Sequence, residues 1–150
     1  MAESLSIIVL DSSFTIGIES IDQEHGYLIA IYNNLVSGIE SAQGFAVLDQ
    51  TTEKLFSYAD YHFVSEEMVM TAAGYPGLAQ HRKQHASFIA TLEEQLADRS
   101  QGHATLRIKL AKFVGRWIQE HILASDRAFG AWFRTAQLGA SPPGASPPAG

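Results

Sequence analysis

The spacing of the histidines constrains this chain more than any other feature. Five of its six histidines lie, together with two acids, in segments with the apolar periodicity of helices. A four-residue step on a helix places two side chains on the same face, one turn apart. Such steps join His62 to Glu66 and His81 to His85. The other members of the set are His25, His121 and Asp126. Together the seven residues predict one metal site assembled from several helices.

Apolar residues recur at helical spacing over four long segments. The predicted helices cover residues 22–40, 46–72, 78–98 and 104–129. We expect Ser20 with Gln23, or Asp22, to cap the first helix. Gly74 and Pro76 predict the end of the second. Four helices of about 20 residues, joined by short loops, predict an all-α fold, an up-down-up-down antiparallel four-helix bundle.

The bundle is expected to carry an extension at each end. Residues 1–20 lack helical periodicity and are interpreted as an extended N-terminal arm packed on the bundle, which itself covers residues 21–134. Residues 135–150 contain the sequence Gly-Ala-Ser-Pro-Pro twice. Proline and glycine at this density predict a flexible or polyproline-like tail.

Helix direction places all seven residues at the same height in such a bundle. The set lies near the start of the first and third predicted helices and near the end of the second and fourth. In an alternating antiparallel bundle, these four positions fall at the same end. The weakest member by spacing is Asp126, because a five-residue step from His121 rotates by about 140° on an α-helix, against about 40° for four residues.

Composition excludes several functions. The net charge of −6 argues against a nucleic-acid partner, since phosphate binding needs clustered Lys and Arg. The absence of cysteine excludes thiolate ligands and disulfides. No apolar stretch approaches the roughly 20 residues that span a bilayer, so no membrane insertion is expected. The N-terminus lacks a basic region followed by a long apolar run, so we expect no signal peptide and a cytoplasmic protein.

The donor types indicate which metals are suitable. A single histidine on an apolar face is more often a core residue than a ligand, but five on four inward faces cannot easily satisfy one another. Imidazole and carboxylate donors suit iron, zinc or manganese. Seven donors are too many for one tetrahedral zinc and suit two metals bridged by carboxylates, with one open position. We interpret His103 as a solvated loop residue and Glu67 as a surface acid. Asp22 and Glu24 could support the metal ligands from behind or cap the first helix, and we prefer capping.

Four sequence motifs carry a resemblance to a known family. They are Gly-Ile-Glu-Ser-Ile-Asp-Gln-Glu-His at 17–25, His-Phe-Val-Ser-Glu-Glu-Met at 62–68, His81-x-x-x-His85, and Trp-Ile-Gln-Glu-His-Ile at 117–122 with Asp126. From about Leu10 to Phe129 the chain resembles a hemerythrin domain of the bacterial type. All seven ligand positions of that family are filled in order.

The resemblance implies a non-haem diiron site with an oxo or hydroxo bridge. One iron would be held by His81, His85 and His121, and the other by His25 and His62, which would leave a vacant position. Glu66 and Asp126 would bridge the two. The dioxygen pocket would be lined by Phe63, Trp117, Ile118 and Ile122. Two positions depart from the family pattern, because Leu10 replaces a usual Trp and Ile118 stands where many members have Leu.

The function implied by the resemblance is reversible dioxygen binding, as an oxygen carrier, store or local supplier, and not an enzymatic activity. The alternative is a diiron enzyme or sensor that acts on dioxygen, peroxide or nitric oxide. Oxygenase sites in bundles use Glu-x-x-His pairs, and this chain has none, which favours the carrier. A third hypothesis is a structural or metal-storage bundle.

Overall fold

Apolar residues at helical spacing form four long helical segments. The computed structural model describes residues 5–98 and 102–139. After a short 3-10 turn, η1 (Ser12–Phe14), come α1 (Glu19–Glu40), α2 (Phe45–Ala73), α3 (Leu78–Ala97) and α4 (His103–Glu120). The chain then continues through a π-helical segment, η2 (His121–Asp126), into α5 (Arg127–Gly139).

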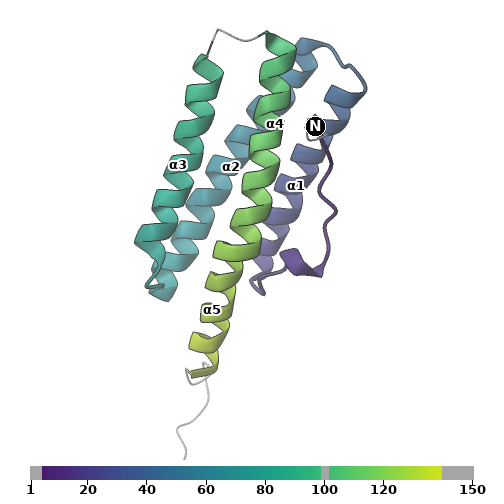
Figure 1. Ribbon diagram of the computed structural model, residues 1–150. Helices are drawn as coiled ribbons and strands as arrows, with labels where there is room; N and C mark the ends of the chain where they lie inside the picture. Colours follow the sequence, from purple (N-terminus) through teal and green to yellow (C-terminus); the bar gives the residue numbers. More distant parts are fainter. Residues whose placement is uncertain (1–4, 99–101, 140–150) are drawn as a thin grey trace, which may run out of the picture.

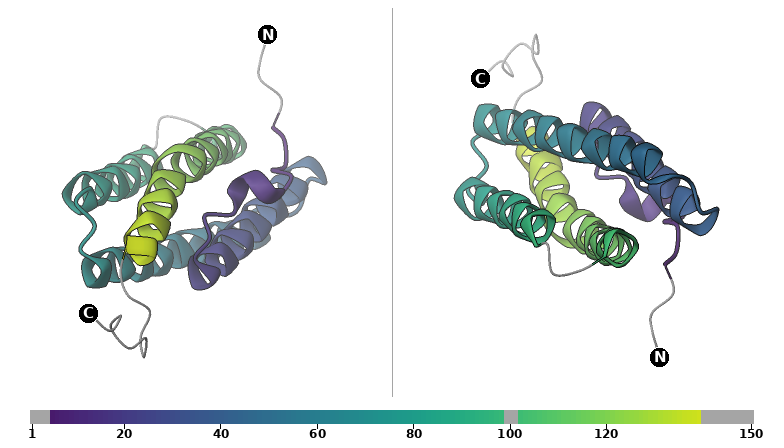
Figure 2. Two further views of the ribbon diagram at one scale, coloured as in Figure 1. Left: turned by 90° about the horizontal axis from the view of Figure 1, so that it is seen from below. Right: turned by 90° about the horizontal axis from the view of Figure 1, so that it is seen from above.

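Each long helix packs against two neighbours. Helix α1 contacts α2 and α4, and α3 contacts the same two helices from the other side. Figures 1 and 2 show the resulting square arrangement, in which successive helices run in opposite directions. The predicted all-α four-helix bundle is therefore confirmed.

The fourth helical segment is longer than expected. We predicted its end near residue 129, whereas α5 continues to Gly139 and includes residues that we assigned to the tail. Figure 1 shows α4, η2 and α5 as one continuous rod that projects past the end of the other helices. The rest of the proposed tail, residues 140–150, lies outside the described residues.

The helix ends agree only partly with the sequence prediction. Helix α2 stops at Gly74, which adopts the left-handed conformation with a φ of 72°. Helix α1 has Ile18 at its N-cap and no side-chain cap, so the capping predictions are wrong. Asp22 instead accepts hydrogen bonds from the backbone N–H groups of Ile16, at 2.7 Å, and Gly17, at 3.1 Å. It therefore ties the preceding segment to the first turn of α1.

The segment before α1 lies against the bundle. The side chain of Asn33 accepts a hydrogen bond from the Ile8 N–H at 2.8 Å and donates one to the Ile8 carbonyl at 2.9 Å. The hydroxyl of Tyr32 donates to the Ser6 carbonyl at 3.0 Å. Ile8 and Phe14 are buried, so this segment contributes apolar side chains to the core.

The described apolar core is divided into two clusters. The larger cluster fills the body of the bundle. The smaller one lies at the end where α1 begins and is built on Ile16, Ile21, Met70 and Phe129. The histidines and acids occupy the helical turns between these clusters, so the polar layer is enclosed by apolar side chains on both sides. In the described part of the chain, every helix is too short or too polar to cross a bilayer.

Candidate metal centre

All seven residues singled out by spacing meet in one buried cluster. Their exposed fractions are 6% or less, and Glu66 and Asp126 are fully buried. Four helical segments supply the side chains: α1 supplies His25, α2 supplies His62 and Glu66, α3 supplies His81 and His85, and η2 supplies His121 and Asp126. The agreement in height that helix direction predicted is therefore present.

The donor atoms fall into two groups, within each of which all donors lie within 4.8 Å of one another. The first group contains His81, His85 and His121 together with Glu66 and Asp126. The second contains His25 and His62 with the same two acids. Two sites that share a pair of carboxylates can hold two cations side by side, and the second site has one protein donor fewer.

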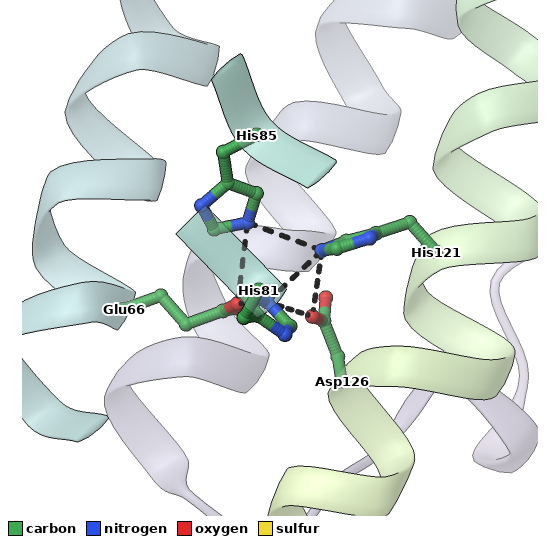
Figure 3. A group of neighbouring side chains, drawn as sticks. All are labelled: Glu66, His81, His85, His121 and Asp126. Carbon is green, nitrogen blue, oxygen red and sulfur yellow. Dashed lines mark hydrogen bonds and ion pairs between the residues drawn. The ribbon is translucent and has the colours of Figure 1, made fainter. Parts of the chain in front are cut away.

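In the first group, ring nitrogens point at one another. The Nε2 atom of His121 lies 3.1 Å from Nε2 of both His81 and His85, and 3.0 Å from Oδ1 of Asp126 (Figure 3). Glu66 contacts His81 and lies 3.5 Å from Nε2 of His85. A neutral imidazole has one nitrogen lone pair, and three such lone pairs facing a common centre are best satisfied by a cation.

Several polar atoms of the cluster form no hydrogen bond although they are buried. They are both ring nitrogens of His25, Nδ1 of His85, Oε2 of Glu66 and both carboxylate oxygens of Asp126. The Nε2 atom of His25 lies 3.0 Å from Oδ2 of Asp126, which is within ion-pair distance but lacks hydrogen-bond geometry. Buried polar groups without partners cost free energy, and metal coordination satisfies them. The orphaned atoms therefore fit a bound metal.

The η2 segment explains how Asp126 joins the cluster. It is a π-helix of six residues that starts at His121 and ends at Asp126. A π-helix closes its hydrogen bonds five residues apart instead of four, so residues i and i+5 come to lie nearly one above the other. The rotation that made this spacing the weakest on an α-helix is thereby removed.

Aromatic rings cover the outer side of two cluster histidines. Phe63 stacks on His85 with ring centroids 3.9 Å apart and an interplanar angle of 8°. Trp117 stacks on His121 at 4.2 Å and 13°. Ile118 and Ile122 are buried in the same apolar cluster as Phe63. Of the four residues expected to form a pocket, Phe63 and Trp117 thus lie against cluster histidines, and Ile118 and Ile122 belong to the adjoining apolar cluster.

Comparison with known proteins identifies the family. Residues 16–133 match the family model described as the hemerythrin HHE cation binding domain. The chain belongs to the hemerythrin family. The match includes every residue of the cluster, so the resemblance found in the sequence motifs is confirmed.

Three relatives are similar to this hemerythrin chain over most of its length. The chain is 32% identical to a bacteriohemerythrin of Stenotrophomonas maltophilia, over 83% of this chain and 80% of that one. It is 31% identical to a bacteriohemerythrin of Clostridium acetobutylicum, over 82% of this chain and 98% of that one. A myohemerythrin of Theromyzon tessulatum is 31% identical over 77% of this chain and 85% of its own length.

Without metal, the acids of the hemerythrin cluster favour charged histidines. Burial alone would lower the pKa of His25 and of His81, but their interactions with Asp126 and Glu66 raise each pKa to about 9. Burial would raise the pKa of Glu66, but the surrounding histidines hold it well below its ordinary value. His85 is the exception, because burial lowers its pKa. The metal-free site is therefore stabilised by buried ion pairs.

This charge state predicts opposite pH dependences for the metal-free and metal-loaded protein. Since the pKa of His25 and His81 is raised, their contribution to stability is complete below pH 6.5 and is lost as the pH rises through about 9. Metal ligation needs neutral imidazole, so the stability added by metal should grow over the same range and be lost on acidification. Melting temperatures of both forms from pH 6 to 9 measure this. Parallel slopes would contradict the assignment.

Three residues that we did not count among the seven ligands differ from one another in their exposure and contacts. His103 is exposed as expected, but it is the first residue of α4 and not a loop residue, and it lies beside Phe45, far along the helix from the cluster. Glu67 is partly buried and pairs with Arg82, with Nε and Oε1 3.5 Å apart. Glu24 is buried and contacts His62, so our preferred interpretation of it as a capping residue is wrong. The contact agrees instead with the alternative role, support of a metal ligand.

Proposed function

We propose that this chain binds two iron ions in the buried cluster and binds dioxygen reversibly, as a carrier, store or local supplier. The observation that carries the proposal is the division of the donors into two groups that share Glu66 and Asp126. Membership of the hemerythrin family supports the choice of iron. A bound pair of ferrous ions supplies the electrons that reversible dioxygen binding requires.

The residues would divide between two positions with different numbers of donors. His81, His85 and His121 would hold one ion, and His25 and His62 the other, with the two acids between them. With two histidines in place of three, the second ion would keep one coordination position free. That position is where an external ligand would enter.

The apolar walls would keep water and protons away from the open position. Phe63, Ile118 and Ile122 are each 3% exposed or less. Trp117 is partly exposed and closes the side next to His121 through its stacked ring. A dry site slows the loss of electrons that would convert a carrier into an oxidised, inactive form.

The donor set favours a carrier over an enzyme. Five histidines with two acids form the cluster, and the sequence contains no Glu-x-x-His pair of the kind that carboxylate-rich diiron sites use. If hydrogen peroxide or nitric oxide were consumed catalytically by the iron-loaded protein, the enzyme alternative would replace the carrier.

The reduced, iron-loaded protein should change its absorption spectrum reversibly in air. We expect a visible band that appears on exposure to dioxygen and disappears under argon over several cycles. Optical spectra recorded during alternating gas exchange test this. Immediate irreversible oxidation, with no band that argon removes, would contradict reversible binding.

A further inference from the structure

A buried acid outside the seven residues contacts one histidine of the cluster. Glu24 lies on α1, directly before His25, and its side chain reaches across to α2. Its Oε1 lies 2.8 Å from Nδ1 of His62, and its Oε2 accepts a hydrogen bond from the Ser65 hydroxyl at 2.8 Å. Both carboxylate oxygens are therefore engaged, and the residue is only 9% exposed.

These contacts fix the orientation and the tautomer of the His62 ring. Its Nε2 faces inward, 3.3 Å from Oε2 of Glu66. A carboxylate only accepts hydrogen bonds, so the outward nitrogen, Nδ1, must carry a hydrogen and donate it to Glu24. In a neutral imidazole this leaves the Nε2 lone pair free to bind a metal.

No other histidine of the cluster has this support among the described residues. The Nδ1 atoms of His25 and His85 are buried and form no hydrogen bond. The acid nearest to Nδ1 of His85 is Glu67, at 4.0 Å, which is beyond hydrogen-bond distance. His62 belongs to the group with one donor fewer, so the supported histidine is one of only two in that group.

We propose that Glu24 is a positioning residue that holds His62 in its metal-binding tautomer and strengthens it as an electron donor to the open half of the site. This inference rests on the proposed diiron function. A carboxylate behind a ligating histidine orients the ring and raises its basicity. Stronger electron donation by a ligand stabilises the oxidised state of the metal relative to its reduced state. Because dioxygen binding draws electron density from the metal, the Glu24 charge should favour the dioxygen-bound form.

Two substitutions separate the charge of Glu24 from its hydrogen bond. Glu24→Gln keeps the size of the side chain and an acceptor for His62 but removes the charge. Glu24→Ala removes both. The matched control is Glu67→Gln, which makes the same chemical change beside His85, where no hydrogen bond exists. Circular dichroism of each variant establishes that the bundle has formed.

The first readout is iron retention, which does not require dioxygen. Reduced, iron-loaded protein is mixed anaerobically with a ferrous chelator, and the release of iron is followed. Loss of an outer partner of a metal ligand weakens metal binding by about 10- to 100-fold. We expect Glu24→Ala to weaken retention to that extent, Glu24→Gln to fall between it and the parent, and Glu67→Gln to behave like the parent.

The second readout distinguishes positioning from a purely structural role. The midpoint potential of the iron pair should rise in Glu24→Gln, because the oxidised state loses an anionic neighbour. It should rise less in Glu67→Gln, because Glu67 pairs with Arg82 and lies 4.0 Å from His85. Proton magnetic resonance of the reduced protein should show an exchangeable, iron-shifted Nδ1–H signal of His62 that persists in Glu24→Gln and is lost by rapid exchange in Glu24→Ala.

The outcomes separate this inference from the proposed function. If folded Glu24 variants match the parent in iron release, potential and the His62 signal, the role of Glu24 is refuted and the diiron site stands. Equal changes in Glu24→Gln and Glu67→Gln would also refute it, because the effect would then be general. If the parent protein itself fails to hold two iron ions, the proposed function fails first.

Discussion

Replacing His121 or His62 by alanine should reduce bound iron to well below two ions per chain. Each side chain supplies a buried Nε2 donor to one of the two groups, and in each case no other described histidine lies close enough to take its place. His121→Ala removes a donor from the group of three histidines. His62→Ala removes one of only two from the other group, so it should leave that position largely empty. Elemental analysis against protein concentration gives the ratio.

The control for both variants is His103→Ala. His103 is exposed at the start of α4, so its replacement by alanine should leave the iron content unchanged. The two cluster variants should also differ in which ion is lost. His121→Ala affects the position with three histidines, and His62→Ala affects the position with two. An equal loss of iron in all three variants would contradict the division of the histidines into ligands and a surface residue.

Phe63→Ala should destabilise the protein strongly and expose the site to water. Phe63 is 3% exposed and contacts the rings of His85, Phe88 and Trp117. Truncation of a buried phenylalanine costs about 3–5 kcal/mol of unfolding free energy. Denaturant titration of the metal-free protein measures this without the added stability that bound metal confers. In the iron-loaded protein, autoxidation should accelerate because the wall of the pocket is lost.

Two companion variants separate volume from position. Phe63→Leu fills most of the space and should show a smaller loss of stability and a smaller increase in autoxidation. Val64→Ala changes the neighbouring residue, which is exposed, and should leave both quantities nearly unchanged. If Phe63→Ala oxidised no faster than the parent, its role in excluding water from the site would be refuted.

The sequence predicted the fold and the composition of the cluster because both follow from periodicity. Helical spacing fixes which side chains share a face, and alternating helix direction fixes their height. These two rules alone were sufficient to bring the five histidines and Glu66 together. They hold without any side-chain detail, since they depend only on the rise and rotation of the helix.

The π-helical segment could not be predicted by the same rule. A template of 3.6 residues per turn places Asp126 well off the face of His121, and only the resemblance to a family retained it as a bridging residue. In the structure, η2 accommodates the five-residue step. The local sequence His-Ile-Leu-Ala-Ser-Asp carries no separate signal for a π-helix, so the deviation depends on the packing and polar contacts of the completed bundle.

The preference for capping roles of Asp22 and Glu24 was wrong for a related reason. Acids in the first turn of a helix are usually interpreted as capping groups, because they favour the free N–H groups there. Asp22 instead accepts hydrogen bonds from the preceding segment, and Glu24 from α2. Contacts between elements distant in sequence decide such roles, and one helix considered alone does not contain them.

A dioxygen titration of the fully reduced protein, with iron counted in the same sample, tests the central claim most directly. Two ions of iron per chain and one dioxygen bound per iron pair, released when dioxygen is removed, are the predicted result. Uptake that removal of dioxygen does not reverse, or a protein that holds at most one iron ion, would contradict a reversible dioxygen site built on the shared acids Glu66 and Asp126.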